Sequence, residues 1–586
     1  MCGIAGIMSA SGEPPDRTAL AAMQQALIHR GPDGEGAHFA AGVGMVQTRL
    51  AVIDLVTGDQ PFKLSDGTAL VANAEIYNYL ELKAGMPEVR FATASDCEVP
   101  LHLYRSQGAD FVDALRGMYA IAIHDPASRR LVLARDPFGI KPLYYAEGRF
   151  GLAFASEPQA LIAAGLVQPR VRAGAAVELL QLQFTTGPET MFDGIRRVLP
   201  GETLIIEAGR IAARRRRSAL PPGGPEPLGE TAALARLDAA LADSVAVHQR
   251  SDVPYGMFLS GGVDSSAVLA EMARLNHRPV RTFTVGFPAT AVADERTRAR
   301  AVAAALGTEH VEVDFTATDF WRLLPRIAAI LDDPVADYAV LPSYKLAQVA
   351  GRELKVILCG EGGDELFGGY GRYRAVMRPA WRGRRAMRTH GFVENLGLLR
   401  HETRSWRRGI AAAEADVDQG GRSRLQVAQA TDCADWLAHD LLIKLDRCLM
   451  AHGVEGRTPL LDPAVAEAAF RLPDGLKVRR GLGKWLLRKW LDGRLPSAEP
   501  FSRKQGFTVP VGEWMAAEGA RLGPLVARHP AIAELCHPEA VEALFRAPVK
   551  RRAFAAWTLL FYALWHRRHI EGLVPQGDVF DCLSEG

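Results

Sequence analysis

The stretch YGMFLSGGVDSS, residues 255–266, decides the fold of the larger part of this chain. Its first half is a short apolar run typical of a buried strand, and residues 265–276 have the spacing of a helix. Glycines and serines at the junction let the backbone approach an anion, which the first N–H groups of the helix then hold. The stretch predicts a phosphate-binding loop. A purely structural turn is the alternative, and the hydroxyls beside an acid argue against it.

The sequence around this loop alternates between strand and helix patterns. An amphipathic helix is predicted at 231–251, before the loop, and the mostly helical remainder runs from about 370 to 575. Such alternation predicts a parallel α/β sheet that binds ligands at the carboxyl ends of its strands. The further predicted strands are 279–287, 310–315 and 354–360, with a helix at 296–307.

Acidic residues in two loops point to a metal. Asp264 in the first loop would repel a phosphate unless a cation lay between them, so it implies Mg²⁺. The second loop, LCGEGGDELFGGY at 358–370, follows a strand and carries Glu361, Asp364 and Glu365. Three acids facing the phosphate loop suggest metal binding and proton handling. A solvated turn is the alternative, and the position after a buried strand argues against it.

The first 210 or so residues differ in pattern from the rest. Short β-branched runs are separated by Gly, Pro and Asp, and helical spacing occurs only at 16–30 and 97–117. This mixture predicts a layered α+β domain. A Pro/Gly-rich stretch then marks a linker. The arginines Arg214 to Arg217 at its start have two readings, a site for an anionic partner or a solvated strand end.

Composition sets broad limits. At 586 residues the chain is long enough for roughly two to four domains. Its net charge of +2 gives no electrostatic case for nucleic acid or a membrane. The seven cysteines are scattered, without the spacing of a disulfide framework or a zinc site. Since no signal peptide and no apolar run of about 18 residues occurs, we expect a cytoplasmic protein.

The second residue is a cysteine, in MCGIAGI. Removal of Met1 would leave Cys2 with a thiol and a free α-amine, a nucleophile with its own base. Their ordinary pKa values, about 8.5 and about 7.7–8.0, allow proton exchange near neutrality. The alternative is that a cysteine occurs at this position by chance and has no function. The rest of the sequence decides between these two interpretations.

Motifs along the whole chain resemble one family. From residue 2 to about 570 the chain is similar to glutamine-hydrolysing asparagine synthetases, most weakly from 375 to 435. The resemblance implies an N-terminal nucleophile (class II amidotransferase) domain of layered antiparallel sheets, and an α/β ATP-pyrophosphatase domain with a helical C-terminal part. We expect a glutaminase domain at 2–212, a linker at 213–229, a synthetase domain at 230–575 and a tail at 576–586. The motifs are MCGIAGI, HRGPDG (29–34), TRLAVIDL (48–55), ANAEIYN (72–78), SDCEV (95–99), RDPFGIKPLYY (135–145), FASE (154–157), the two loops, 440–462 and GLGKWLLRK (481–489).

The resemblance implies roles in the first domain. Met1 is removed and Cys2 attacks the side-chain amide of glutamine, forming a thioester that water releases as glutamate. Arg49 then pairs with the α-carboxylate of glutamine. Asp96, assisted by Glu75, binds the α-ammonium.

The oxyanion site carries one departure from the family. Asn73 and the backbone N–H of residue 74 are the expected donors. The family usually has Gly at that position and this chain has Ala74. The N–H survives, so only the efficiency of the glutaminase is in question, through any need for a positive φ.

In the second domain the resemblance implies an ATP site. Glu361 is the expected base for ammonia, Lys484 neutralises phosphate charge, and Asp446 with Arg447 supports the site from behind. Asp264 and Asp364 would hold Mg²⁺. Two further departures, Cys359 and the EGR of 455–457, remove no needed charge. The residues expected around ATP are Leu259, Ser260, Gly261, Gly262, Asp264, Ser265, Ser266, Val285, Gly286, Gly360 and Glu361.

The implied reaction converts aspartate to asparagine through a β-aspartyl-adenylate, with AMP, pyrophosphate and glutamate as products and ammonia moving inside the protein. Glutamine, ATP and aspartate are the expected partners, and a homodimer is left open. A same-family amidotransferase acting on another carboxylate, in a cell-surface sugar, peptide or secondary metabolite, shares these motifs. A β-lactam-forming synthetase and a non-catalytic sensor are disfavoured, because Cys2 and the metal acids are intact.

Overall fold

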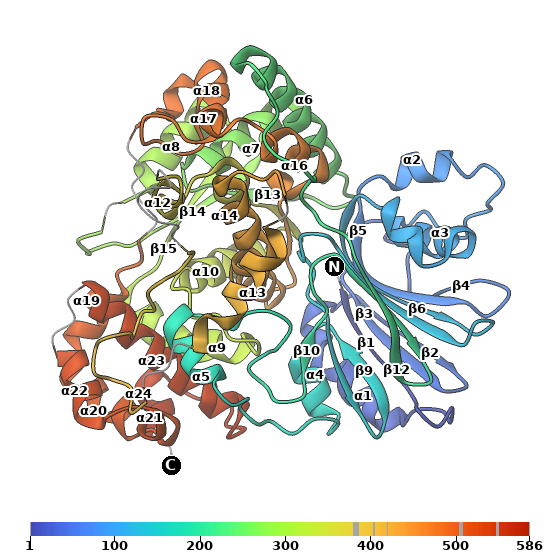
Figure 1. Cartoon of the computed structure of the whole chain (residues 1–586), viewed down its shortest axis with the longest axis horizontal. Helices are drawn as coiled ribbons and strands as arrows, with labels where there is room; N and C mark the ends of the chain where they lie inside the picture. Colours follow the sequence, from blue (N-terminus) through green and yellow to red (C-terminus); the bar gives the residue numbers. More distant parts are fainter. Residues whose placement is uncertain are drawn as a thin grey trace.

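The structure is a computed structural model that describes residues 2–292, 294–378, 386–401, 405–418, 420–502, 508–546 and 550–584. Two antiparallel sheets occupy one side of the molecule, on the right of Figure 1. A parallel sheet and its helices make up the other side. The helices α19 to α24 lie below that sheet in the same view.

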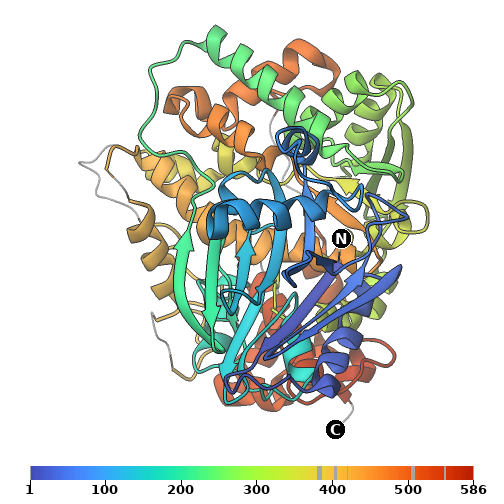
Figure 2. The same ribbon diagram turned by 90° about the vertical axis from the view of Figure 1, so that its right-hand side faces the viewer.

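The N-terminal part consists of two six-stranded sheets, ordered β10-β8-β9-β1-β3-β2 and β12-β11-β7-β6-β5-β4. All printed pairings within them are antiparallel, and the two sheets face the viewer in Figure 2. The strands of the first sheet are β1 (Cys2–Met8), β2 (Gly34–Ala40), β3 (Val43–Arg49), β8 (Tyr144–Gly148), β9 (Gly151–Ala155) and β10 (Arg196–Arg197). Those of the second are β4 (Phe62–Lys63), β5 (Ala69–Ile76), β6 (Gly117–Asp125), β7 (Arg130–Arg135), β11 (Glu202–Glu207) and β12 (Arg210–Arg216).

The core of this part lies between the two sheets. Ile4 and Met45 from one sheet meet Val71 and Ala120 from the other, and all four are fully or almost fully buried. Helices cover the outer faces: α1 (Arg17–Ala26) and α4 (Pro158–Ala163) pack on the first sheet, and α3 (Val99–Gln107) on the second. The layered α+β arrangement predicted from the sequence is confirmed.

The second sheet system is parallel throughout, with strand order β15-β14-β13-β16-β17. Its strands are β13 (Tyr255–Phe258), β14 (Arg281–Gly286), β15 (Glu309–Asp314), β16 (Val356–Leu358) and β17 (Glu455–Arg457). The predicted α/β sheet is confirmed, but β17 was not predicted. Its three residues include two charges, and only pairing with β16 makes them a strand.

Helices cover both faces of the parallel sheet. On one face lie α6 (Glu230–His248), α7 (Val263–Leu275), α8 (Arg296–Ala305), α16 (Pro463–Phe470) and α18 (Trp485–Arg494). On the other lie α9 (Ala317–Ile330), α10 (Val340–Ala350), α15 (Leu442–Met450) and α23 (Lys550–His569). The remaining helices are α2 (Tyr79–Ala84), α5 (Ala175–Leu182), α11 (Gly363–Phe367), α12 (Gly371–Val376), α13 (Arg408–Val417), α14 (Arg424–Asp432), a π-helix (Cys433–Leu441), α17 (Asp474–Lys477), α19 (Val511–Ala517), α20 (Gly519–Arg528), α21 (Pro530–Leu535), α22 (Pro538–Arg546) and α24 (Val579–Ser584).

The helix α5 joins the two parts. Although it comes from the N-terminal half, it packs against α23 near the C-terminal end (Figure 1). The two halves therefore share one continuous apolar core. None of the described helices is long and apolar enough to cross a membrane.

The arginine run forms the end of the edge strand β12. Arg214 pairs with Glu202 at 2.9 Å, Arg215 with Asp110, and Arg216 with Asp416 at 3.4 Å. These contacts support the solvated strand end among the two readings. Since β12 continues to Arg216, we propose that the linker starts at 217 rather than at 213. A basic stretch of the sequence, RPAWRGRRAMRTHGF at 378–392, lies in part outside the described residues.

Candidate active sites in the two halves

Strand alternation brings three polar side chains together between the antiparallel sheets. In β5, Asn73 and Glu75 lie on the same face as Val71, and in β1, Cys2 lies on the same face as Ile4. Val71 and Ile4 belong to the core between the sheets, so the three polar residues face one another at its end. The Cys2 backbone N–H donates to Asn73 Oδ1 at 3.1 Å. Met1 itself lies outside the described residues.

The Asn73 side chain has a donor to spare. It is fully buried, and its Nδ2 has no hydrogen-bond partner among the described residues. A buried amide donor beside a thiol suits a developing negative oxygen. The neighbouring Ala74 is paired with Tyr119 in the regular ladder, and its φ is not among the positive values of the described residues. Alanine at this position is therefore unstrained.

Arg49 lies directly opposite Cys2 in the pairing of β1 with β3. Its Nη1 donates to Asp59 Oδ1 at 2.8 Å, and its Nη2 donates to the carbonyl oxygen of Asp54. Asp59 is 78% exposed, whereas the arginine side chain is buried. A carboxylate from a ligand can therefore replace Asp59 at the guanidinium with little loss of packing.

Two carboxyl groups complete this pocket. Asp96 accepts the Ile76 N–H at 2.7 Å, and burial raises its pKa. Burial, with Glu455 nearby, raises the pKa of Glu75 well above its usual range. Buried carboxyl groups of this kind fit a cationic ligand group, which would compensate their charge.

Sequence reasoning missed Arg457, which reaches the pocket from the other half of the molecule. Its Nη2 lies 2.9 Å from Glu75 Oε2, and its Nε donates to Glu455 at 2.5 Å. Its backbone carbonyl accepts the N–H of Cys359 at 2.8 Å, next to the second acidic loop. The EGR motif at 455–457 contains this arginine. The sequence assigns the arginine no role, because its partner Glu75 is distant in sequence.

The loop expected to bind phosphate follows β13. Ser260 and Ser265 hydroxyls lie 3.1 Å apart, and the Ser260 N–H donates to Ser265 Oγ at 3.3 Å. The Ser266 hydroxyl is buried without a partner among the described residues. Leu259 continues the strand, donating to Phe283 O at 2.8 Å. The hydroxyls and the start of α7 therefore line one end of the sheet.

The second loop lies against the first. A Cβ on Gly360 would come within 2.8 Å of the Ser265 nitrogen, and one on Gly363 within 2.3 Å of Asp264 Oδ1. Only glycine allows this approach. Val285 and Gly286 end the neighbouring strand β14 at the same edge. The residues expected around ATP therefore gather at the carboxyl edge of the sheet.

Lys484 lies between Asp264 and Asp364, the two acids expected to hold Mg²⁺. Its Nζ contacts Asp264 Oδ2 and lies 2.9 Å from Asp364 Oδ1. Burial alone would lower its pKa, but the two carboxylates raise it. Two carboxylates at one point form the hard-oxygen donor set that Mg²⁺ prefers. The residues present therefore fit the implied metal.

Glu361 precedes Asp364 by three residues in the second loop. Its side chain is 29% exposed, and Lys444 Nζ lies 3.9 Å from Oε1 while also contacting Asp337 at 3.1 Å. Burial, reinforced by the neighbouring acids, raises the pKa of Glu361. A raised pKa suits a carboxylate that accepts a proton from a bound nucleophile.

A buried ion network connects the halves. Arg30 donates to the Cys2 carbonyl at 3.3 Å, to Glu157 at 2.7 Å, and to both oxygens of Asp446 at 2.7 and 2.9 Å. Asp446 was expected to support the ATP site from behind, and the structure places it instead against Arg30 of the first half. Arg30 and Glu157 lie in quoted motifs, but Asp446, the further partner of Arg30, is distant in sequence.

The neighbouring Arg447 extends this network. Its Nε donates to Asp332 Oδ1 at 3.0 Å, and Asp332 in turn accepts the Gln159 N–H at 2.8 Å. Asp332 had no signal in the sequence. The thiol site and the synthetase helix α15 are therefore held in a fixed relation through fully buried charges.

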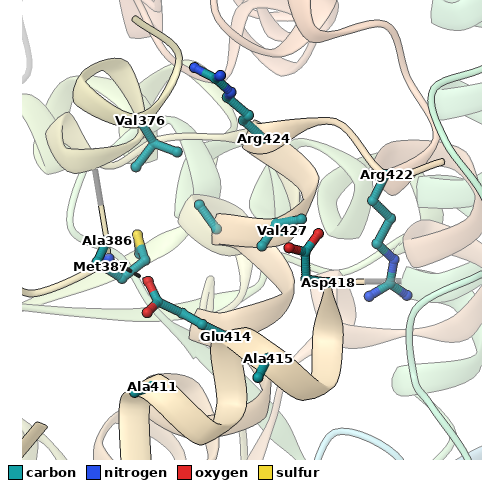
Figure 3. A pocket seen from close by; sticks show the side chains of 11 residues that line it. Val376, Ala386, Met387, Ala411, Glu414, Ala415, Asp418, Arg422, Arg424 and Val427 are labelled. Atoms are coloured by element: carbon teal, nitrogen blue, oxygen red, sulfur yellow. Dashed lines mark hydrogen bonds between the residues drawn. The ribbon is translucent and has the colours of Figure 1, made fainter. Parts of the chain in front are cut away.

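A cavity of about 410 Å³ lies elsewhere, beside α13 and α14 (Figure 3). Glu414, which accepts the Met387 N–H at 2.5 Å, and Arg422 are among its lining residues. None of the residues singled out from the motifs lines it. It lies in the region of weakest resemblance, and we assign it no role.

Comparisons with known proteins agree with both halves. The family model described as asparagine synthase matches residues 236–567, and the glutamine amidotransferase domain matches residues 1–216. The putative asparagine synthetase (glutamine-hydrolyzing) of Mycobacterium tuberculosis is 34% identical over 98% of both chains. Asparagine synthetase (glutamine-hydrolyzing) 1 of Bacillus subtilis is 32% identical over 97% of both, and the Zea mays enzyme 28% over 100% of this chain and 90% of its own. The chain belongs to the family of glutamine-hydrolysing asparagine synthetases and is a glutamine-hydrolysing ligase.

Proposed function

We propose that this enzyme amidates aspartate to asparagine through a β-aspartyl-adenylate, using ammonia that Cys2 releases from glutamine. One observation carries the proposal for the synthetase half: Lys484 lies between Asp264 and Asp364, where the two glycine-rich loops meet. We propose units of 2–216 and 230–575 for the two activities. The free state of all seven cysteines supports a reducing, cytoplasmic setting.

The glutaminase step begins at the thiol. With Met1 removed, the α-amine of Cys2 takes the thiol proton, and the sulfur attacks the glutamine amide. The spare Nδ2 of Asn73 donates to the oxyanion that forms. Arg49 binds the α-carboxylate of glutamine in place of Asp59, and Asp96 with Glu75 binds the α-ammonium.

The synthetase step takes place at the carboxyl edge of the parallel sheet. Ser260, Ser265 and the first N–H groups of α7 hold the phosphates of ATP. Lys484 offsets phosphate charge as the aspartate β-carboxylate attacks and pyrophosphate leaves. Mg²⁺, bound by Asp264 and Asp364, would supply further charge neutralisation. Ammonia then displaces AMP, and Glu361 takes a proton from the attacking nitrogen.

Ammonia must pass from one half to the other without leaving the protein, because water would otherwise compete for the adenylate. The buried contacts support such a passage. Arg30 touches Cys2 and α15, while Arg457 touches Glu75 and the strand beside the Glu361 loop. Both contacts fix the distance between the two sites.

The test is exchange of labelled pyrophosphate into ATP, run with aspartate and with other carboxylates, followed by identification of the amide by mass. We expect exchange that depends on aspartate and disappears in Asp264→Asn, because that variant loses a metal ligand. Exchange with a different carboxylate alone would make the enzyme an amidotransferase for that acceptor. No exchange with any carboxylate, in protein shown to bind ATP, would contradict adenylation.

A further inference from the structure

Two imidazoles and one carboxylate converge far from both candidate active sites. His529 ends α20 and precedes α21, His566 lies in the last turn of α23, and Glu571 follows that helix. One ligand atom from each residue lies within 4.8 Å of the other two. Glu571 Oε1 is 3.0 Å from His566 Nδ1 and 3.5 Å from His529 Nε2. The helices α20, α21 and α23 lie well below β13 in Figure 1.

The His529 ring is unsatisfied where it lies. Its side chain is 1% exposed, and neither ring nitrogen has a hydrogen-bond partner among the described residues. A neutral imidazole carries one donor and one acceptor, and buried polar groups in folded proteins are normally paired. A ligand bound between the three side chains would satisfy this ring.

The donor set selects the chemistry of that ligand. Two imidazole nitrogens and one carboxylate oxygen form the three-ligand set of open zinc sites, with Zn–N bonds of about 2.0–2.1 Å. Tetrahedral ligand atoms at that bond length lie about 3.3 Å apart, close to the separations of Glu571 from each ring. The two imidazole nitrogens lie within 4.8 Å of each other and would close to that separation around the ion. Burial lowers the pKa of both histidines, which leaves the rings neutral and able to bind a cation.

The surroundings favour one oxygen of the carboxylate. Arg567 Nη1 holds Glu571 Oε2 at 2.9 Å, which leaves Oε1 turned towards the histidines. Such an outer hydrogen bond orients a ligand in the manner usual for metal sites. Glu571 is 27% exposed and His566 14% exposed, so an ion can enter from solvent.

We propose that His529, His566 and Glu571 bind one divalent transition-metal ion, with Zn²⁺ the best fit and water as the fourth ligand. The ion joins the α20–α21 junction to the end of α23. That end also meets the N-terminal half, where His569 Nδ1 lies 3.1 Å from Gln159 Oε1. The site therefore fastens the C-terminal helices to the rest of the molecule, and its role is structural.

The test uses the full chain after removal of metals with a chelator, titrated with Co²⁺ and then with Zn²⁺. We expect one equivalent of Co²⁺ with the visible bands of a nitrogen–oxygen tetrahedral site, displaced by Zn²⁺, and a higher melting temperature with either ion. His566→Gln and Glu571→Gln should weaken binding at least about tenfold. Both residues are partly exposed, so the variants should fold.

The control is His390→Gln. His390 faces Glu394 at 3.2 Å on the surface, which gives it one imidazole and one carboxylate, and the described residues supply no further ligand there. It should leave binding and the thermal shift unchanged. Unaltered Co²⁺ affinity in both His566→Gln and Glu571→Gln would overturn the proposal, as would a thiolate-to-cobalt charge-transfer band, which would place the ion at a cysteine. Titration with Mg²⁺ alone should not displace the cobalt, which separates this site from the one at Asp264.

Discussion

The two candidate active sites are built in opposite ways. In the proposed glutamine pocket the functional side chains project from strands, with Cys2 at the start of β1, Arg49 at the end of β3 and Asn73 within β5. In the proposed ATP site they project from a loop or from the first turn of the helix that follows one, as Glu361 and Asp264 do. Strand register fixes the first set, whereas the second depends on glycines and on mutual charge. We therefore expect the geometry of the pocket to survive the loss of a charged side chain. The geometry of the loops should change when a charged side chain is lost.

The largest expected effect is a loss of activity with glutamine, but not with ammonia, as the nitrogen source. Cys2→Ala should reduce glutamine-dependent amide formation by more than about 10⁴-fold, because the nucleophile is lost. Ammonia-dependent synthesis should continue, since the synthetase loops contain no part of the thiol site. Steady-state rates with glutamine and with ammonium chloride measure both.

The matched control for this prediction is Cys97→Ala. Cys97 is also buried, and its Sγ donates to the Ala74 carbonyl at 3.4 Å next to Asn73. It should keep most of its glutaminase activity. Equal loss of both activities in Cys2→Ala would contradict the division into two sites.

The second prediction concerns the loops. Glu361→Gln should slow amide formation about 10²–10⁴-fold, the usual cost of losing a positioned base, while glutaminase activity stays intact. Glu365→Gln is the control, because Glu365 is a buried acid of the same loop that bonds to Tyr370 at 2.6 Å. Release of asparagine and of glutamate, measured separately, tests both. Similar losses in the two variants would remove the special role of Glu361.

The sequence predicted the loop-borne site more completely than the strand-borne one. A glycine-rich loop after a buried strand is a local signal, so the positions of Asp264 and Glu361 at the sheet edge followed from a few residues. The layered N-terminal fold also followed from short alternating strands. Local chemistry leaves Cys2 with two readings and Asn73 is identified only by resemblance, because nothing local shows that two strands about 70 residues apart lie face to face.

Contacts between the halves were not predictable at all. Arg457 with Glu75 and Arg30 with Asp446 are pairs separated by hundreds of residues, and the sequence around each residue does not indicate its partner. The strand β17 was missed for the same reason. Its residues have no strand pattern of their own and are ordered by pairing with β16. The histidine cluster at His529 likewise has no local spacing signal.

The third prediction tests whether the synthetase half tunes the glutamine pocket. Arg457→Lys should raise KM for glutamine about 10–100-fold and leave ammonia-dependent synthesis little changed. The guanidinium makes four contacts, to Glu75, Glu455 and two backbone carbonyls, which a single ammonium cannot reproduce. Loss of one buried contact between charged groups costs about 1.5–3 kcal/mol, which corresponds to this change in KM. Initial rates across glutamine concentrations give KM and kcat separately.

The control here is another arginine that crosses between the halves. Arg116 pairs with Asp462 at 2.8 Å and Asp243 at 2.6 Å, away from the pocket residues. Arg116→Lys should leave KM for glutamine unchanged. A Glu75→Gln, Arg457→Lys double variant should be less than additive, because the pair acts as one unit. Full additivity would mean that Arg457 does not act through Glu75.

The smallest expected effect is a pH dependence of the contact between the halves. Asp435 in the π-helix is buried, and its Oδ1 accepts the Gly187 N–H from the first half at 3.0 Å. Burial, with Glu178 nearby, raises its pKa to about 7. A raised pKa means that the folded state favours the protonated acid. The contribution of Asp435 to the stability of the folded state is complete below the unfolded pKa of about 3.9, and it is lost as the pH rises towards 7. Asp435→Asn mimics the protonated acid and should gain stability over the wild type with rising pH, up to about 2–4 kcal/mol. Melting temperatures of both proteins from about pH 5 to about pH 8 measure the difference.

Asp416→Asn is the control, since this exposed acid pairs with Arg216 on the surface and contributes little. If the difference in melting temperature between Asp435→Asn and the wild type stayed constant across that pH range, the charge of Asp435 would not affect this contact. The contact would then resemble the strand-borne pocket, whose geometry we expect to survive the loss of a charge.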